Sequence, residues 1–230
     1  MKKYSDITKA LHKDGYIFII IFCAITFILS SISCNLGWIS FFLTLFCCYF
    51  FRNPERMTPL GSDLVISPAD GTIVNIEETN PPKELEIEEK MLKISIFLSV
   101  FDVHVNRVPM DGQILSLHYN PGKWLNASLD KASVHNERQS IVLQTEKNEK
   151  IVFVQIAGLI ARRIVCDLEE GMNVKAGQRF GIIRFGSRVD VYLPLHAAPS
   201  VSVGQTVIGG ETILANLNDQ TSQKLTYAVR

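Results

Sequence analysis

Cysteine is scarce in most of this 230-residue sequence. One apolar N-terminal stretch contains Cys23, Cys34, Cys47 and Cys48, which leaves Cys166 alone in the remainder of the chain. A single cysteine cannot build a disulfide framework, and the spacing of cysteine and histidine is not that of a zinc site. We therefore expect Cys166 to be buried and reduced, the part of the chain beyond the apolar stretch to be intracellular, and no metal to be bound.

Net charge is also lacking. Lys+Arg and Asp+Glu both number 23, so the formal net charge is +0. No global field exists that would attract nucleic acid, and we expect no nucleic-acid partner. Recruitment to a membrane would rely on apolar insertion rather than on lipid charge.

Charged residues are absent from Gly15 to Phe51. A helix needs about 20 apolar residues to span a bilayer. Residues 16–33 meet that length, and 37–51 form a shorter second candidate, with Asn35 and Gly37 expected at the turn. A buried soluble helix and a cleaved signal peptide are the alternatives, but the apolar run continues well past the small residues at which a signal would be cleaved.

Basic residues flank the apolar stretch on both sides, which favours a cytoplasmic location for both of its ends; they are Lys2, Lys3, Lys9 and Lys13 before it and Arg52 and Arg56 after it. A single crossing does not satisfy this pattern. Residues 1–56 are therefore predicted to form a membrane-associated helical hairpin at the inner cell membrane.

Residues 57–230 read as a mainly β domain. Short β-branched runs alternate with Gly, Pro and Asn, and few windows hold a helical period. The stretch TNPPKELEIEEK is expected to be an exposed loop without function. A weak repeat, EGMNVKAGQRFGII and PSVSVGQTVIGGETILANL, is similar to strands of biotinyl- and lipoyl-type barrel-sandwich domains. Those domains carry their cofactor on a lysine at a turn, and the corresponding turns here lack one, which disfavours a carrier.

Three residues could form an oriented base and a hydroxyl nucleophile: Asp70, His104 and Ser187. Asp70 precedes a glycine in SPADG, where a turn is the usual reason for the pair. His104 lies on an expected strand and shares a face with Asp102. In RFGSRVDVYLP the period of two predicts a half-buried strand, and the Gly186–Ser187 pair interrupts it. A bulge is the structural alternative at this pair.

Longer motifs occur in one order along the chain: NPER, SPADG, FLSVFDVHVNRVP, PGKWLNASLDKAS, NER, QIAGLIARRIVC and RFGSRVDVYLP. From about residue 53 to 217 this series resembles the phosphatidylserine decarboxylase proenzymes, in particular their short bacterial and archaeal form. The resemblance extends to the membrane-anchored N-terminus.

That resemblance implies self-cleavage between Gly186 and Ser187. The Ser187 hydroxyl would attack the Gly186 carbonyl, and elimination and hydrolysis would leave a pyruvoyl group in place of Ser187. A larger chain, 1–186, would stay associated with a smaller one, 187–230; homo-oligomers are left open. Glycine tolerates the distorted backbone that this attack requires. His104, oriented and charged by Asp70, is the expected general base.

The implied reaction is the decarboxylation of phosphatidylserine in the bilayer to phosphatidylethanolamine and carbon dioxide, a step of phospholipid biosynthesis on the cytoplasmic side. The pyruvoyl ketone would form a Schiff base with the substrate amine and requires no metal. His104 is also the nearest candidate proton donor. Arg162, Arg163 and Lys123 are either solvated charges or contacts to the lipid phosphate.

The sequence departs from the long form of the family at one position. Long-form enzymes carry two histidines three residues apart, and here His104 is followed by Arg107, which stays protonated and cannot act as a base. Either His104 serves both self-cleavage and decarboxylation, or another residue, such as His135, serves one of these two steps.

Three other functions are alternatives to a phosphatidylserine decarboxylase. A membrane-tethered serine hydrolase would use the same three residues but remain one chain. A membrane-anchored adaptor would need coiled-coil heptads, which the sequence lacks. A pyruvoyl decarboxylase of a soluble amino acid is disfavoured by the anchor.

Overall fold

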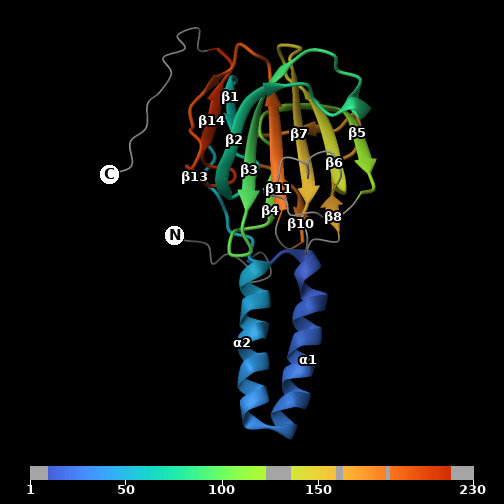
Figure 1. Cartoon of the computed structure of the whole chain (residues 1–230), viewed down its shortest axis with the longest axis vertical. Coiled ribbons are helices and arrows are strands. Elements are labelled where there is room, and N and C mark those ends of the chain that lie inside the picture. Colours follow the sequence, from blue (N-terminus) through green and yellow to red (C-terminus); the bar gives the residue numbers. More distant parts are fainter. Residues whose placement is uncertain (1–9, 123–135, 159–162, 185–186, 219–230) are drawn as a thin grey trace, which may run out of the picture. The chain divides into compact units, whose positions relative to one another are not determined.

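The structure is a computed structural model that describes residues 10–122, 136–158, 163–184 and 187–218. Contacts between Cα atoms divide the chain into two compact units, Met1–Glu55 and Arg56–Arg230. The first is helical and the second is built from strands (Figure 1).

The helical unit consists, in its described residues, of a short 3-10 helix, Lys13–Gly15, followed by α1, Tyr16–Ile32, and α2, Cys34–Phe50. Lys13–Ile32 is a continuous helical stretch of 20 residues with mean hydropathy 2.4, long and apolar enough by length and composition to cross a membrane. α2 is apolar but shorter. Hydroxyl groups join the two helices: Thr26 Oγ1 lies 2.8 Å from Ser40 Oγ and 2.9 Å from Thr44 Oγ1.

The turn between these helices is not where the sequence predicted it. Ser33 alone separates them, in an extended conformation. Asn35 and Gly37 lie inside α2. Gly37 is needed for close packing rather than for a turn, because a Cβ at this position would lie 2.6 Å from Ser30 Oγ of α1.

The second unit is mainly β, as predicted. Its strands are β1 Leu64–Ile66, β2 Gly71–Thr79, β3 Met91–Leu98, β4 Val105–Arg107, β5 Gly112–Asn120, β6 Arg138–Gln144, β7 Lys150–Ala157, β8 Ile164–Cys166, β9 Asn173–Val174, β10 Arg179–Ile183, β11 Ser187–Leu193, β12 Ala198–Pro199, β13 Thr206–Val207 and β14 Ile213–Asn216.

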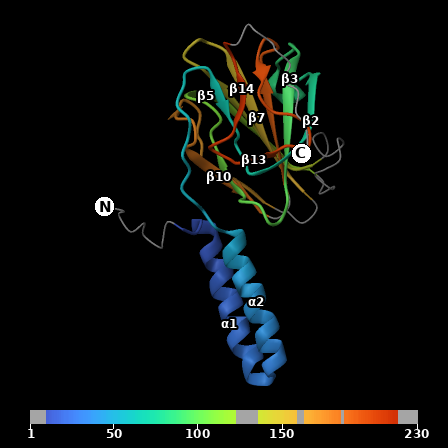
Figure 2. The ribbon, with the colours of Figure 1, turned by 90° about the vertical axis from the view of Figure 1, so that its left-hand side faces the viewer.

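Within the described residues these strands form a curled eight-stranded sheet of order β13-β2-β3-β11-β7-β6-β5-β9 and two small sheets, β1-β14-β12 and β4-β10-β8 (Figures 1 and 2). Their pairings are antiparallel. One apolar core joins the three sheets, since Val189 of the large sheet, Phe180 of β10 and Leu214 of β14 belong to the same buried cluster. We call the face of the large sheet that lines this core the inner face.

β11 lies between β3 and β7 and is buried along its whole length. Val189, Val191 and Leu193 point to the inner face. The alternate residues Arg188 and Asp190 are also buried, so the prediction of a half-buried strand was wrong. The polar side of β11 is not solvated but paired: Arg188 Nε donates to Asp190 Oδ1 at 2.6 Å, and Arg188 Nη2 donates to Ser95 Oγ at 2.8 Å.

The loop between β2 and β3 covers part of the outer face of the large sheet, which is the face opposite the inner one. The prediction that this loop is merely exposed was wrong. Leu85 and Ile87 pack on an apolar cluster that includes Tyr192. Glu84, in the short 3-10 helix Lys83–Leu85, accepts hydrogen bonds from Arg138 Nε at 2.7 Å and Arg138 Nη2 at 2.9 Å, which tie the loop to β6.

Candidate functional site

Connections between the large sheet and the sheet β4-β10-β8 begin and end side by side. In the large sheet, Ser187 at the start of β11 pairs with Leu98 at the end of β3 and with Ala157 at the end of β7. In the small sheet, Ile183 at the end of β10 pairs with Ile164 at the start of β8, and its N–H donates to the His104 carbonyl at 3.4 Å. The segments 99–104, 158–163 and 184–186 therefore join the same two places.

Ser187 occupies the centre of this junction. Its side chain is fully buried, and its Oγ has no hydrogen-bond partner in the part of the chain that the structure describes. Side chains alternate along a strand, and Val189, two residues further along β11, is in the core. Leu98, which pairs with Ser187, is in the core as well. Ser187 therefore points to the inner face. Gly186, the other half of the predicted cleavage site, lies outside the described residues.

His104 lies on the small-sheet side of this junction, directly before β4. It is fully buried, and its Nδ1 lies 3.0 Å from the Asp102 carbonyl oxygen. A carbonyl only accepts, so a neutral His104 carries its proton on Nδ1 and keeps the Nε2 lone pair for another proton. The expected neighbour Asp102 thus contacts His104 through its backbone, while its carboxylate Oδ2 accepts from the Ser99 N–H at 2.7 Å.

Asp70 lies at the same end of the large sheet, two strands from Ser187. It directly precedes β2, whose Thr72 pairs with Phe97 of β3, and Phe97 in turn pairs with Arg188 of β11. Two strand spacings are about 10 Å. Asp70 Oδ2 accepts a hydrogen bond from Arg56 Nη2 at 2.7 Å, and Asp70 Oδ1 accepts one from the Gly209 N–H at 2.8 Å.

Arg107, at the position of the long form's second histidine, is held by both turns of the weak sequence repeat. Its Nη1 donates to the Gly177 carbonyl at 2.8 Å, and a Cβ at Gly210 would lie 2.6 Å from its Cδ. Burial, together with the charges of Arg179 and Arg56, lowers the pKa of Arg107 to about 10. It therefore remains protonated at neutral pH, and its contacts are those of a packing residue.

Of the three candidates for binding the lipid head group, only Arg163 lies within the described residues. Arg163 is exposed, and its carbonyl accepts from the Arg184 N–H at 3.3 Å, so its backbone adjoins the junction. Arg162 and Lys123 lie outside the described residues, as does His135.

Two stretches to which the sequence analysis assigned no catalytic residue have structural roles at the junction. In NER, Asn136 Nδ2 donates to the Ala157 carbonyl at 2.7 Å, and Glu137 Oε1 accepts from the Ile164 N–H at 3.3 Å. In the apolar strand KIVFVQIA, Gln155 Nε2 donates to Asn106 Oδ1 at 2.8 Å. A lone amide within an apolar strand was the signal that sequence reasoning passed over.

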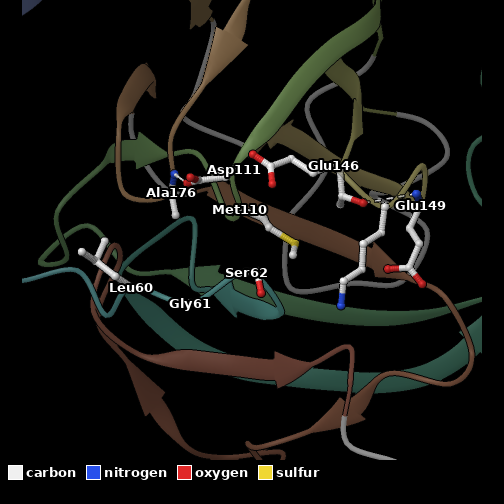
Figure 3. Close-up of a pocket in the computed structure, with 10 residues that line it drawn as sticks. Leu60, Gly61, Ser62, Met110, Asp111, Glu146, Glu149 and Ala176 are labelled. Atoms are coloured by element: carbon white, nitrogen blue, oxygen red, sulfur yellow. Dashed lines mark hydrogen bonds between the residues drawn. The ribbon is translucent and has the colours of Figure 1, made fainter.

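A cavity of about 300 Å³ lies at the opposite end of the large sheet (Figure 3). Its lining includes Asp111, next to the start of β5, and Glu149, next to the start of β7. The start and end of β7 are roughly 23 Å apart at 3.3 Å per residue. Two acidic groups of the cavity are paired: Asp111 Oδ2 accepts from Lys175 Nζ at 2.8 Å, and Glu149 Oε1 lies 3.0 Å from His196 Nε2. This cavity is separate from the junction around Ser187.

Among the described residues, no group of three or more His, Cys, Asp or Glu side chains could hold a metal ion.

Comparison with known proteins gives a consistent result. The sequence profile of a family described as phosphatidylserine decarboxylase matches residues 43–215. A phosphatidylserine decarboxylase proenzyme of Rickettsia bellii (strain OSU 85-389) is 60% identical over 228 residues, covering 99% of both chains. Proteins of the same name from Rickettsia akari (strain Hartford) and Rickettsia prowazekii (strain Madrid E) are 62% identical over 217 residues, with 94% of both chains covered, and 58% identical over 228 residues, with 99% covered.

Proposed function

This chain belongs to the phosphatidylserine decarboxylase family, and on that premise we propose that it decarboxylates phosphatidylserine by means of a pyruvoyl group made from its own Ser187. The observation that carries this proposal is the Ser187 hydroxyl, which is fully buried and has no hydrogen-bond partner within the described residues. A buried hydroxyl at the start of a strand is consistent with formation of the pyruvoyl group at Ser187, because a buried polar atom without a hydrogen bond needs an explanation.

Self-cleavage begins with Ser187 Oγ. As the hydroxyl attacks the Gly186 carbonyl carbon, His104 Nε2 accepts its proton and returns it to the Ser187 nitrogen when the C–N bond breaks, which leaves an ester. Loss of the Ser187 α-proton and of the Gly186 carboxylate then gives dehydroalanine. Addition of water with release of ammonia completes the pyruvoyl group. His104 suits the first step because its Nδ1 is engaged by the Asp102 carbonyl and its Nε2 is the basic atom.

Asp70 is proposed to favour the protonated form of His104 by its negative charge at the same end of the sheet. Its oxygens accept hydrogen bonds from Arg56 and from the Gly209 N–H, and these bonds fix the position of the charge. Arg56 belongs to the motif NPER and Asp70 to SPADG, and the hydrogen bond between them accounts for the joint presence of both motifs.

The two chains should stay associated after cleavage. β11, at the start of the smaller chain, pairs on one side with β3 and on the other with β7, both in the larger chain. Val189, Val191 and Leu193 remain in the core that the two chains share. The break would fall before the first paired residue and would cost none of these contacts.

Bound in this site, a pyruvoyl group supplies an electron sink for the carbon dioxide lost from an amine substrate. His104 would hold the proton that replaces the lost carboxyl group. The burial of Ser187 and His104 excludes water, which strengthens electrostatic effects at the site. Arg163 is the described candidate for the lipid phosphate, with Arg162 and Lys123 as further candidates.

The helical unit is proposed to anchor the chain in the inner membrane, with the β unit on the cytoplasmic side. At 1.5 Å per residue, the 20-residue stretch Lys13–Ile32 is about 30 Å long, the thickness of the hydrocarbon core. The bonds of Thr26 with Ser40 and Thr44 satisfy hydroxyl groups that hydrocarbon could not.

The test is release of carbon dioxide from carboxyl-labelled phosphatidylserine in detergent micelles, with free serine as the competing substrate. The unaltered chain should release label from the lipid, and Ser187→Ala should not. Release from serine but not from the lipid would assign the enzyme to soluble amines. A single chain that releases no label but reacts with a serine-directed phosphonate would point to a hydrolase.

A further inference from the structure

Two buried amides join the large sheet to the sheet β4-β10-β8 beside Ser187. Gln155 of β7 and Asn106 of β4 are both fully buried. Gln155 Nε2 donates to Asn106 Oδ1 at 2.8 Å and faces the Val165 carbonyl at 3.5 Å. Because a carbonyl only accepts, the Val165 contact fixes which end of the Gln155 amide carries the nitrogen. Asn106 consequently offers its oxygen to Gln155 and turns its Nδ2 donor elsewhere.

The remaining polar atoms of this pair have no hydrogen-bond partner within the described residues: Asn106 Nδ2 and Gln155 Oε1 are buried and unsatisfied, as is Ser187 Oγ. Each such atom costs about 1–3 kcal/mol of desolvation. Proteins satisfy nearly all buried polar groups, so each of these three atoms needs an explanation.

Strand pairing places Gln155 close to Ser187 on the inner face of the large sheet. Gln155 pairs with Val189 and Ala157 pairs with Ser187, so Gln155 is the diagonal neighbour of Ser187 on the inner face, about 7–8 Å away between backbones. Its hydrogen bond brings Asn106 to the same place. That bond turns Asn106 toward β7, and His104 lies two residues before Asn106, directly before β4.

We infer that Asn106 Nδ2 is the donor that stabilises the oxyanion of self-cleavage and that Gln155 is the residue that positions it; the inference rests on the function proposed above. When Ser187 Oγ bonds to the Gly186 carbonyl carbon, the carbonyl oxygen takes up the displaced electron pair. That oxygen returns the pair when the C–N bond breaks. The step consumes no co-reactant, and a buried N–H held by Gln155 lowers its barrier without reorganisation.

Asn106→Asp tests the donor directly. It preserves the size of the side chain and the oxygen that accepts from Gln155, and it replaces the N–H donor by oxygen. We expect self-cleavage to slow by about 10²–10³-fold, the usual effect of losing one oxyanion donor. Asn106→Ala, which buries no charge, should show a similar loss, and Gln155→Leu, which leaves Asn106 in place but unanchored, a smaller one. Cleavage is followed on denaturing gels from cell-free synthesis of the full chain in detergent.

Asn120→Asp is the matched control. Asn120 is at the same end of the sheet, but its Nδ2 donates to Glu84 Oε1 at 2.8 Å, in the cluster that covers the outer face. This variant should cleave at the unaltered rate. Thermal unfolding of each variant carrying Ser187→Ala, which blocks cleavage, shows whether it folds.

Hydroxylamine locates the affected step, because it cleaves the ester but not the peptide. Asn106 variants that remain slow in hydroxylamine are blocked before the ester, as the inference requires. Full rescue by hydroxylamine would place their defect after the ester and overturn the inference. So would folded Asn106 variants that cleave at the unaltered rate while Ser187→Ala does not cleave. If the unaltered chain itself stays intact, the proposed function fails and not this inference alone.

Discussion

Arg188 and Asp190 lie on the outer side of the strand that begins with Ser187, joined at 2.6 Å with both side chains fully buried. A buried ion pair is costly to form, but removal of one partner is costlier still because it strands a charge. The pair neutralises two buried charges just beyond the proposed cleavage site, and Arg188 also ties β11 to β3 through Ser95.

Removal of one member of this pair should be strongly destabilising. We expect Arg188→Met to lower the free energy of unfolding by about 3–5 kcal/mol, because Asp190 is left buried and unpaired. Denaturant unfolding in detergent measures it. The double variant Arg188→Met/Asp190→Leu should recover much of the loss. If the single change had the negligible effect expected of an exposed pair such as Lys175–Asp111, Arg188 would not be buried as described.

The contact between Gly210 and Arg107 can be isolated with a second glycine. Gly210 and Gly171 both have φ of 81°, but a Cβ at Gly171 would meet nothing within 4 Å. Gly171→Ala should cost only the backbone strain, about 1–2 kcal/mol. Gly210→Ala should cost roughly 1–3 kcal/mol more, because its methyl group overlaps Arg107 Cδ. Thermal unfolding compares them. Equal losses would contradict the contact, and Arg107→Ala should relieve the extra cost of Gly210→Ala.

Cys166 should be a slow nucleophile. The side chain is partly buried, and not fully buried as the sequence predicted; this partial burial raises the pKa of its thiol to about 11. Only the thiolate is alkylated, so its rate with iodoacetamide should still rise about tenfold per pH unit between pH 8 and 9.5, where an ordinary thiol with a pKa of about 8.5 levels off. Mass spectrometry of the peptide that contains Cys166 separates it from the other cysteines. A plateau near pH 9 would show that the thiol is not buried.

The Glu84–Arg138 link should stabilise the protein at neutral pH and fail in acid. Burial, the largest single cause, raises the pKa of Glu84, but the hydrogen bonds from Arg138, a backbone N–H and Ser140, together with the charge of Arg138, outweigh it and lower the pKa of the carboxyl below its usual 4.5. A depressed folded pKa gives stability that is present above the unfolded value and lost as pH falls through the folded one. Glu84→Gln should therefore lower the thermal midpoint at pH 7, and the difference should shrink below about pH 4.5. A difference that did not vary with pH would contradict an ionic role.

The sequence was sufficient to predict the β class and the apolar helices, because these depend on local periodicity. It could not predict the burial of Arg188 and Asp190. Their burial depends on a distant loop, whose charged composition was typical of an exposed segment but whose Glu84 is paired with Arg138 of β6. Cover by remote segments leaves no local periodic signal.

The candidate site shows the same limit. His104 and Ser187 were chosen for their chemistry, and their placement at connections between the same two sheets is a long-range feature that no local pattern contains. The Asp102 carbonyl, rather than a carboxylate, lies beside His104 Nδ1. A backbone partner of this kind is invisible to reasoning from residue types. The packing of Arg107 against both repeat turns was likewise hidden, although the repeat itself was recognised.

The central claim is that the chain cuts itself at Ser187 and converts that residue to pyruvoyl. Intact mass of the purified protein under denaturing conditions tests it most directly. The account predicts two chains that divide between residues 186 and 187, the smaller weighing one ammonia less than residues 187–230 and resisting N-terminal sequencing. One full-length chain that persists through prolonged incubation, or a smaller chain that keeps its N-terminal serine, would contradict it.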